Sequence, residues 1–178
     1  MKKRQLKLMV LTAMFIALGY VLPFLTGSVP EIGKMLCPMH IPAFLCGIVC
    51  GPLWAVAYGI TTPLLRSLTL GAPKLFPSAI AMAVELPVYG VVCALMKKLL
   101  PKGIVFDFIG LVISMLAGRL MSGLCSFILL GIEGSGYAFG TFITTHFVMA
   151  WPGILLQLLL IPAISYGLEK AKLIPIKD

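Results

Sequence analysis

The sequence has few charged residues, and acidic residues are especially scarce. Only six Asp and Glu occur among 178 residues, and charged residues make up 11% of the chain. A soluble domain usually carries about 25% charged residues. Hydrophobic residues reach 60% and the mean hydropathy is +1.08. So much apolar surface cannot be covered in water by so little charge, whereas lipid removes the problem. The composition therefore excludes an ordinary soluble domain and predicts an integral membrane protein.

The sequence also lacks the motifs of common catalytic and metal sites. It contains no Walker A sequence, no His-Glu-x-x-His and no Gly-x-Ser-x-Gly. Its two histidines, His40 and His146, lie far apart in the chain. ATP hydrolysis by a Walker motif, a zinc intramembrane protease and a serine hydrolase are therefore not indicated. We expect no enzymatic activity, no cofactor and no bound metal.

Cysteine usage does not indicate a disulfide framework or a metal site. The five cysteines are an odd number, and most lie inside apolar runs. Cys46 and Cys50 are four residues apart and would share a helix face, but no neighbouring His or carboxylate completes a site. Since buried free cysteine behaves as a small hydrophobe, we expect these thiols to be packing residues.

The formal net charge of +8 comes from short basic clusters between the apolar runs. No basic face with interleaved aromatic residues is present, so nucleic acid is not an expected partner. Clusters of this kind are typical of the cytoplasmic surface of a protein embedded in a lipid bilayer. The clusters are Lys2, Lys3, Arg4 and Lys7, then Lys97, Lys98 and Lys102, then Lys170, Lys172 and Lys177.

The apolar runs allow five or six membrane spans. They cover roughly residues 6–25, 36–65, 75–96, 104–130 and 138–168. The first run is too long for a signal peptide and no cleavage site follows it, so it predicts a retained helix. The second run is either one long tilted helix or two short ones, because Gly51-Pro52 at its middle is a strong helix breaker.

Charge decides the number of spans. Six spans with a cytoplasmic N-terminus put ten basic residues inside and three outside, whereas five spans put six inside and seven outside. The positive-inside rule favours six. We therefore predict an all-α integral membrane protein of the cell membrane, with one six-helix domain over residues 1–178 and both termini cytoplasmic. Helices two and three are expected to be short and joined by a tight Gly-Pro turn. The outer loops would cover residues 26–39, 66–76 and 131–141, and binding loops would gather on the outer face.

Ionisable residues inside a span are candidates for function, because they are costly in lipid. Glu85 falls in span four and Arg119 in span five, at similar depth in the outer half. They would either pair with each other and hold two helices together, or face a pocket and bind a ligand. His40 could instead reach the outer boundary, and His146 and Trp151 could be interface anchors. The predicted substrate-binding residues are Glu85, Tyr89, Arg119, His146, Trp151, His40, Lys34 and Tyr137.

Two segments resemble a known family. Residues 40–59 contain Gly47-Ile48-Val49-Cys50-Gly51-Pro52, which is similar to the hairpin between spans two and three of the substrate-binding S components of energy-coupling factor (ECF) vitamin transporters. Ala13 and Ala17 form a small-xxx-small face on the first helix, which resembles the Ala-x-x-x-Ala docking motif of that family. The chain departs from the family at Ala55, where the family often has Gly, and at Arg66, where an acidic residue is common.

This resemblance implies a membrane-embedded protein that captures a vitamin or vitamin precursor outside the cell. It would then dock, through Ala13 and Ala17, on a transmembrane coupling subunit driven by two cytoplasmic ATPases. The alternative is a structural membrane protein of the cell-shape type, without a ligand. Two ligand classes remain open. Arg66, Lys74 and Arg119 would suit a carboxylate such as pantothenate, and Glu85 with aromatic residues would suit a pyridine or pyrimidine vitamin.

Overall fold

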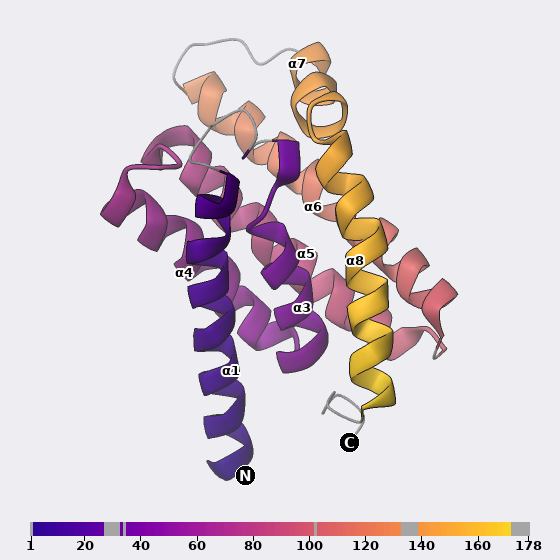
Figure 1. Cartoon of the computed structure of the whole chain (residues 1–178). Coiled ribbons are helices and arrows are strands. Elements are labelled where there is room, and N and C mark those ends of the chain that lie inside the picture. The colour runs from indigo at the N-terminus through magenta and orange to yellow at the C-terminus, as the bar shows by residue number, and fades with distance from the viewer. Residues whose placement is uncertain (1, 27–32, 34, 102, 133–138, 172–178) are drawn as a thin grey trace.

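The chain folds into a bundle of helices (Figure 1). The computed structural model describes residues 2–26, 33, 35–101, 103–132 and 139–171, and this part of the chain contains helices and no strand. The prediction of an all-α protein is therefore confirmed, but the described residues form seven α-helices and not the six that were predicted. The elements are α1 (Lys2–Val21), η1 (Leu22–Thr26), α3 (His40–Cys50), α4 (Pro52–Leu70), η2 (Leu75–Ala79), α5 (Ile80–Leu99), α6 (Ile104–Ile132), α7 (Phe139–Ile143), η3 (Thr144–Val148) and α8 (Trp151–Lys170).

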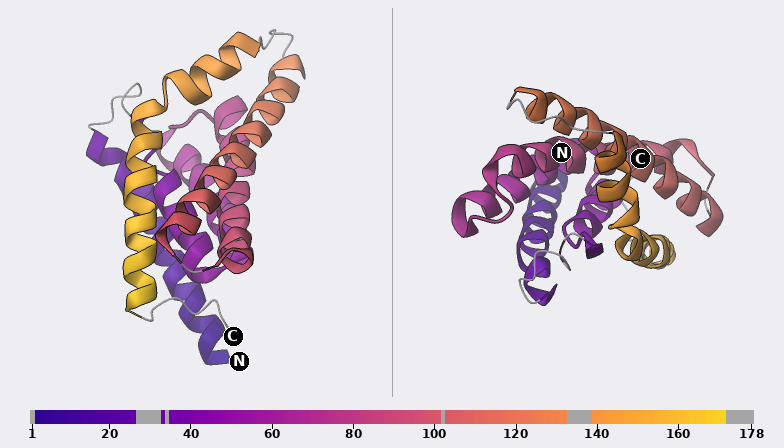
Figure 2. Two further views of the ribbon diagram at one scale, coloured as in Figure 1. Left: turned by 90° about the vertical axis from the view of Figure 1, so that its right-hand side faces the viewer. Right: turned by 90° about the horizontal axis from the view of Figure 1, so that it is seen from above.

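The first and last helices give the bundle two distinct ends. α1 begins and α8 finishes at the same end, as both side views show (Figures 1 and 2). We call this the inner end, and the opposite end, where α7 lies, the outer end. The first basic cluster, at the start of α1, and Lys170, at the close of α8, lie at the inner end. This arrangement agrees with an even number of crossings, while the cytoplasmic location of the inner end stays a prediction.

Within the described residues, four helical segments are long and apolar enough to cross a membrane: Lys2–Phe24, Leu75–Leu99, Ile104–Gly131 and Trp151–Lys170. α3 has 11 residues, a length of about 16 Å, and cannot cross a hydrocarbon core of ~30 Å alone. α4 was expected to be equally short but has 19 residues. It continues past Arg66 to Leu70, where Gly71 caps it, so the second outer loop begins later than predicted.

α3 and α4 meet at the Gly51-Pro52 breaker. Gly51 has a φ of 92°, which a side chain would disfavour, and Pro52 occupies the first turn of α4, where its missing N–H leaves no partner unsatisfied. Nine of the eleven α3 residues are buried, and α3 packs against α1, α4, α5 and α8. Because neighbouring helices surround it, the short helix is shielded from lipid, as a half-length helix requires.

Glycine allows α3, α4 and α5 to approach at backbone distance. A Cβ built at Gly47 of α3 would lie 2.8 Å from the Gly90 Cα of α5. A Cβ at Gly90 would lie 2.5 Å from the Ala55 Cβ of α4. Such contacts replace the hydrophobic driving force, which is absent between helices in lipid.

The last apolar run, residues 138–168, was predicted to be one span. The structure divides it into α7, η3 and α8. Pro152 lies in the first turn of α8, where its ring favours a new helix and its missing N–H would break a continuous one. α6 extends to Ile132 and α7 starts at Phe139, so helix occupies both ends of the predicted third outer loop, residues 131–141.

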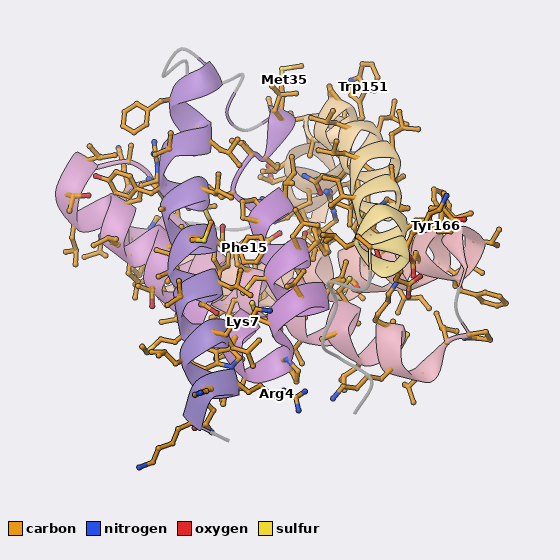
Figure 3. The ribbon with its side chains drawn as sticks, turned by 60° about the horizontal axis from the view of Figure 1, so that its bottom comes forward. Arg4, Lys7, Phe15, Met35, Trp151 and Tyr166 are labelled. Carbon is orange, nitrogen blue, oxygen red and sulfur yellow. The ribbon has the colours of Figure 1, made fainter. Side chains whose placement is uncertain are left out.

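Large apolar side chains cover the outside of the bundle, as expected for a protein surrounded by lipid. Leu53, Leu68 and Leu159 are among the most exposed. Figure 3 shows Arg4 and Lys7 on the first turns of α1 and Trp151 at the other end of the molecule, pointing away from the bundle. The four apolar helices and this surface agree with a multi-pass membrane protein.

Candidate functional site

Polar side chains from four segments meet in the interior, towards the outer end. Glu85 and Tyr89 lie one turn apart on α5 and so share a face, and Arg119 and Ser122 do the same on α6. α3 contributes its first residue and η3 contributes a histidine. We call this group the outer polar cluster; its members are His40, Glu85, Tyr89, Arg119, Ser122 and His146.

Glu85 is the central carboxylate of the cluster. The Tyr89 hydroxyl donates to Glu85 Oε1 at 2.7 Å, and His40 Nε2 lies 3.5 Å from the same oxygen. Ser122 lies next to this carboxylate as well. Glu85 is 6% exposed. A carboxylate at this depth is tolerated only when such partners compensate for lost water.

The His40 ring lies beside Glu85 and Tyr89, and one of its nitrogens has no hydrogen-bond partner among the described residues. The ring lies edge-on to Tyr89, with centroids 5.1 Å apart. Its second nitrogen, Nδ1, is buried and has no hydrogen-bond partner among the residues that the structure describes. An unsatisfied buried polar atom costs about 1–3 kcal/mol. His40 is thus a buried partner of Glu85 and not a boundary residue, and a ligand could satisfy Nδ1.

Arg119 does not pair with Glu85. Arg119 is 4% exposed, and its guanidinium lies over the Phe147 ring, 5.4 Å from the centroid. Within the described ranges, no carboxylate lies within ion-pair distance of Arg119. The hypothesis of a Glu85–Arg119 clamp is therefore wrong for these residues. Arg119 nevertheless shares a face of α6 with Ser122 and lies over the residue that follows His146, which places it in the cluster.

His146 ties η3 to α6. Its Nδ1 lies 3.2 Å from the Phe142 carbonyl oxygen, and its Nε2 lies 3.1 Å from the Ser122 hydroxyl. Because a carbonyl oxygen only accepts, Nδ1 carries the hydrogen, and in the neutral ring Nε2 accepts from Ser122. The histidine therefore positions η3 over the outer side of the cluster.

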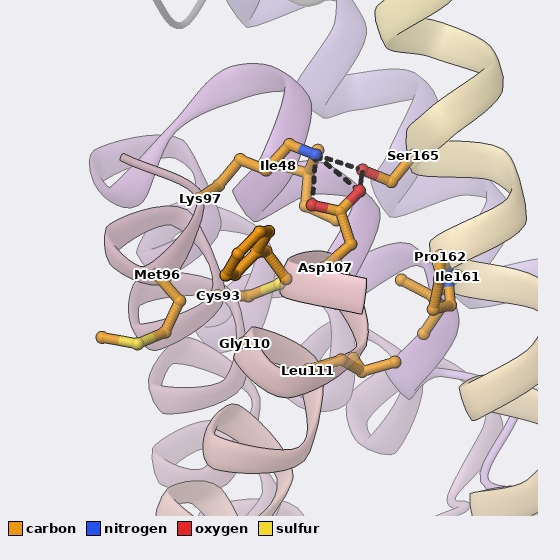
Figure 4. Close-up of a pocket in the computed structure, with 11 residues that line it drawn as sticks. Ile48, Cys93, Met96, Lys97, Asp107, Gly110, Leu111, Ile161, Pro162 and Ser165 are labelled. Carbon is orange, nitrogen blue, oxygen red and sulfur yellow. Dashed lines mark hydrogen bonds and ion pairs between the residues drawn. The ribbon is translucent and has the colours of Figure 1, made fainter. Parts of the chain in front are cut away.

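A second polar network lies at the inner end, between α5, α6 and α8 (Figure 4). Lys97 Nζ donates to both carboxylate oxygens of Asp107, at 2.5 and 2.7 Å, and to Ser165 Oγ at 2.8 Å. It also lies 3.1 Å from Glu169 Oε1, while the Ser165 hydroxyl donates to Asp107 at 2.9 Å. We call these four residues the inner polar network. All the charges have partners, so the network joins three helices.

A cavity of about 10 Å³ adjoins the inner polar network (Figure 4). This is room for about one water molecule, and far too little for a vitamin. The inner cavity therefore cannot be the site of a substrate. The outer polar cluster is the better candidate, because among the described residues His40 Nδ1 has no hydrogen-bond partner and Arg119 has no acidic partner.

Residues 7–165 match the protein family described as ECF transporter, substrate-specific component. The chain belongs to this family. No curated protein and no solved structure matches it. The family resemblance inferred from residues 13–17 and 40–59 is thus confirmed, because the family match covers most of the chain. The family consists of substrate-binding transporter subunits and is not a family of enzymes.

The structure places the other predicted site residues of this substrate-specific component differently. Trp151, the first residue of α8, is 57% exposed and does not join the cluster, which fits the interface-anchor alternative. Lys34 and Tyr137 lie outside the described residues. Ala13 and Ala17 are exposed on α1, so the bundle itself does not use them for packing.

Sequence reasoning missed several polar contacts of the substrate-specific component. Ser122 and Phe147 contact cluster members, and Gln157 of α8 donates to the Cys37 carbonyl at 3.4 Å. Gln157 could have been found, because it is a lone amide in an apolar helix. Lys97 and Asp107 face each other across the short turn between α5 and α6, a spacing of ten residues that could have indicated their pairing.

Proposed function

We propose that this protein is the membrane-embedded subunit that captures a water-soluble vitamin or vitamin precursor from outside, for ATP-driven uptake by an ECF-type importer. The observation that carries the proposal is the outer polar cluster, whose members are buried except for the partly buried His146, in a chain of the substrate-specific component family. A polar cluster in an apolar bundle is costly unless its groups find partners. His40 Nδ1 has none among the described residues, so the cluster has bonding capacity left for a ligand.

Two connections at the outer end support a ligand site there. The segment before α3 packs on α8, since a Cβ at Gly153 would lie 2.5 Å from the Met35 carbonyl oxygen. On the other side, the η3 histidine contacts Ser122 of α6. The cluster thus lies beneath the two connections that would carry the first and third outer loops. A ligand would enter from the outer end and be covered by these connections.

The exposed side of α1 supports docking on a partner. Ala13 and Ala17 lie there beside Val10 and Met14, which are also exposed. Small side chains allow another helix to approach closely in lipid. We propose that this face contacts a transmembrane coupling subunit, which two cytoplasmic ATPases drive. In that arrangement the inner end, where α1 begins and α8 ends, is cytoplasmic.

Binding measurements on the purified protein test the proposed function. The detergent-solubilised protein would be titrated calorimetrically with a panel of water-soluble vitamins, and one of them should bind. Glu85→Gln and Tyr89→Phe should each weaken this binding about 5- to 150-fold. The first removes the buried charge and the second the hydroxyl with which a ligand in the cluster would interact, and such an interaction is worth about 1–3 kcal/mol.

Tyr166→Phe is the matched control for Tyr89→Phe, because Tyr166 is exposed on α8, away from the cluster. It should leave binding unchanged. Size-exclusion profiles and melting temperatures without ligand would show that each variant is folded. If the protein binds no member of the panel, or if the folded cluster variants bind as the parent does, the cluster is not a vitamin site. A structural membrane protein of the cell-shape type would give the first of these results.

A further inference from the structure

We propose that the substrate of the outer polar cluster is a monocarboxylic acid and that Arg119 binds its carboxylate. This inference rests on the proposed function and goes beyond it by naming the substrate class. It separates two classes that the sequence leaves open, the carboxylates and the pyridine or pyrimidine vitamins. The argument starts from what each basic side chain of the outer half already contacts.

The Arg66 side chain, on α4, already has partners in α1 and η1. Its Nη1 donates to the Tyr20 carbonyl at 2.5 Å, and its guanidinium lies 5.0 Å from the centroid of the Phe24 ring. Lys74 is exposed just before η2, so water solvates its charge. Neither side chain belongs to the outer polar cluster. Among the described residues, Arg119 is therefore the cation that faces the candidate site.

The charges inside the cluster are unequally matched. Glu85 has a cationic or hydrogen-bonding partner in His40 and a second donor in Tyr89. Arg119 has the Phe147 ring, but no hydrogen bond and no ion pair joins its guanidinium to a described residue. A guanidinium carries five N–H donors, and a buried one without an anion is unfavourable. An anionic ligand would provide the missing partner.

The geometry of the guanidinium selects the kind of anion. Its planar fork matches a carboxylate, which it binds through two parallel hydrogen bonds. One arginine balances one negative charge, so a monocarboxylate fits better than a doubly charged phosphate ester. A cationic vitamin would place a second positive charge beside the Arg119 guanidinium and be repelled by it, since the Glu85 carboxylate already has His40 and Tyr89 as partners. The acid would also carry a hydroxyl or amide group, because His40 Nδ1 lacks a partner within the described structure.

Matched ligand pairs test this inference on the full-length protein in detergent. The probes are pantothenate with pantothenol and biotin with its methyl ester; thiamine serves as a cation, and nicotinamide and pyridoxine serve as neutral pyridines. Dissociation constants would be measured by calorimetry. The bound acid should exceed its uncharged counterpart by about 10- to 150-fold in affinity, the usual value of a charge-assisted hydrogen bond.

Arginine variants connect that preference to one side chain. Arg119→Gln should lower the affinity of the acid about 10- to 150-fold and change that of the uncharged counterpart little. Arg119→Lys should keep part of the preference, because it retains the charge without the fork. Lys74→Gln, a control at an exposed basic residue, should change neither affinity. Arg119→Lys keeps the test valid if the glutamine variant does not fold.

The outcomes separate this inference from the proposed function. Tighter binding of thiamine, pyridoxine or an uncharged counterpart, unaffected by Arg119→Gln, would overturn the acid as substrate and leave vitamin capture intact. Binding of no probe at all would overturn both. A double-mutant cycle showing that Arg119 is coupled to Glu31 or Glu133, two acids outside the described residues, would also overturn it, because Arg119 would then have a partner within the chain.

Discussion

Replacement of Lys97 by methionine should strongly destabilise the protein. Lys97 is the only cation among the four residues of the inner polar network. Its Nζ contacts the carboxylates of Asp107 and Glu169 and the Ser165 hydroxyl. The Lys97 and Asp107 side chains are 9% and 7% exposed. Methionine fills a similar volume but leaves two carboxylates close together without a cation.

The magnitude follows from the burial of the two acids. Removing one partner of a buried ion pair costs about 3–5 kcal/mol, because the remaining charge is left uncompensated. Glu169 is more exposed, at 20%, so solvent screens part of its repulsion and Asp107 contributes most of the cost. Glu169→Gln alone should therefore cost only about 0–1 kcal/mol. Asp107→Asn should lie between, at about 1–3 kcal/mol, because the amide oxygen still accepts from Lys97.

Reversible unfolding in mixed micelles, with increasing sodium dodecyl sulfate, measures these free energies. Lys98→Met is the matched control, since Lys98 is the next residue on α5 and is exposed. It should change the free energy of unfolding by less than about 0.5 kcal/mol. The double variant Lys97→Met with Asp107→Asn should be more stable than the sum of the single effects predicts, by about 1–3 kcal/mol. Equal effects of Lys97→Met and Lys98→Met, or strict additivity in the double variant, would refute the reasoning.

Three further results are expected from packing and topology. Gly47→Ala should lower the free energy of unfolding by about 1–3 kcal/mol, because its Cβ would overlap the α5 backbone. Gly167→Ala, with open space around its Cβ, should be neutral or stabilising, and equal unfolding curves for the two variants would contradict this reasoning. Ala13→Leu with Ala17→Leu should abolish uptake by cells while the dissociation constant of the purified protein is unchanged; loss of both would indicate packing within the subunit. A cysteine placed at Asp178 in a cysteine-free variant should resist an impermeant maleimide in intact cells, and labelling from outside would rule out a cytoplasmic C-terminus.

The helical class could be predicted because its signals are local. Apolar runs and the Gly51-Pro52 breaker specify where helices form and where α3 gives way to α4. The helix ends were predicted less well. α4 extends four residues beyond Arg66, whose side chain reaches the Tyr20 carbonyl of α1, a contact no local pattern reveals. The division of residues 138–168 into α7, η3 and α8 depends on Pro152, whose effect is hidden within a continuous apolar run.

The candidate site was predicted in its members but not in its pairing. A polar residue in an apolar run is conspicuous, so Glu85, Arg119 and His40 could be selected without a structure. Their partners depend on how each helix is rotated and how deeply it lies. Glu85 faces His40 and Tyr89, while Arg119 faces Phe147.

Composition and hydrophobic runs are properties of the chain, and they suffice to predict an apolar, all-helical membrane protein with a few buried polar residues. Which of those residues meet depends on the tertiary structure. Lys97 belongs by sequence to a basic cluster at the membrane surface, yet the packing of α5 against α6 and α8 surrounds it with Asp107, Ser165 and Glu169. An ion pair or hydrogen bond acts over a few ångströms between side chains, and that distance is set by helix packing and not by spacing along the chain.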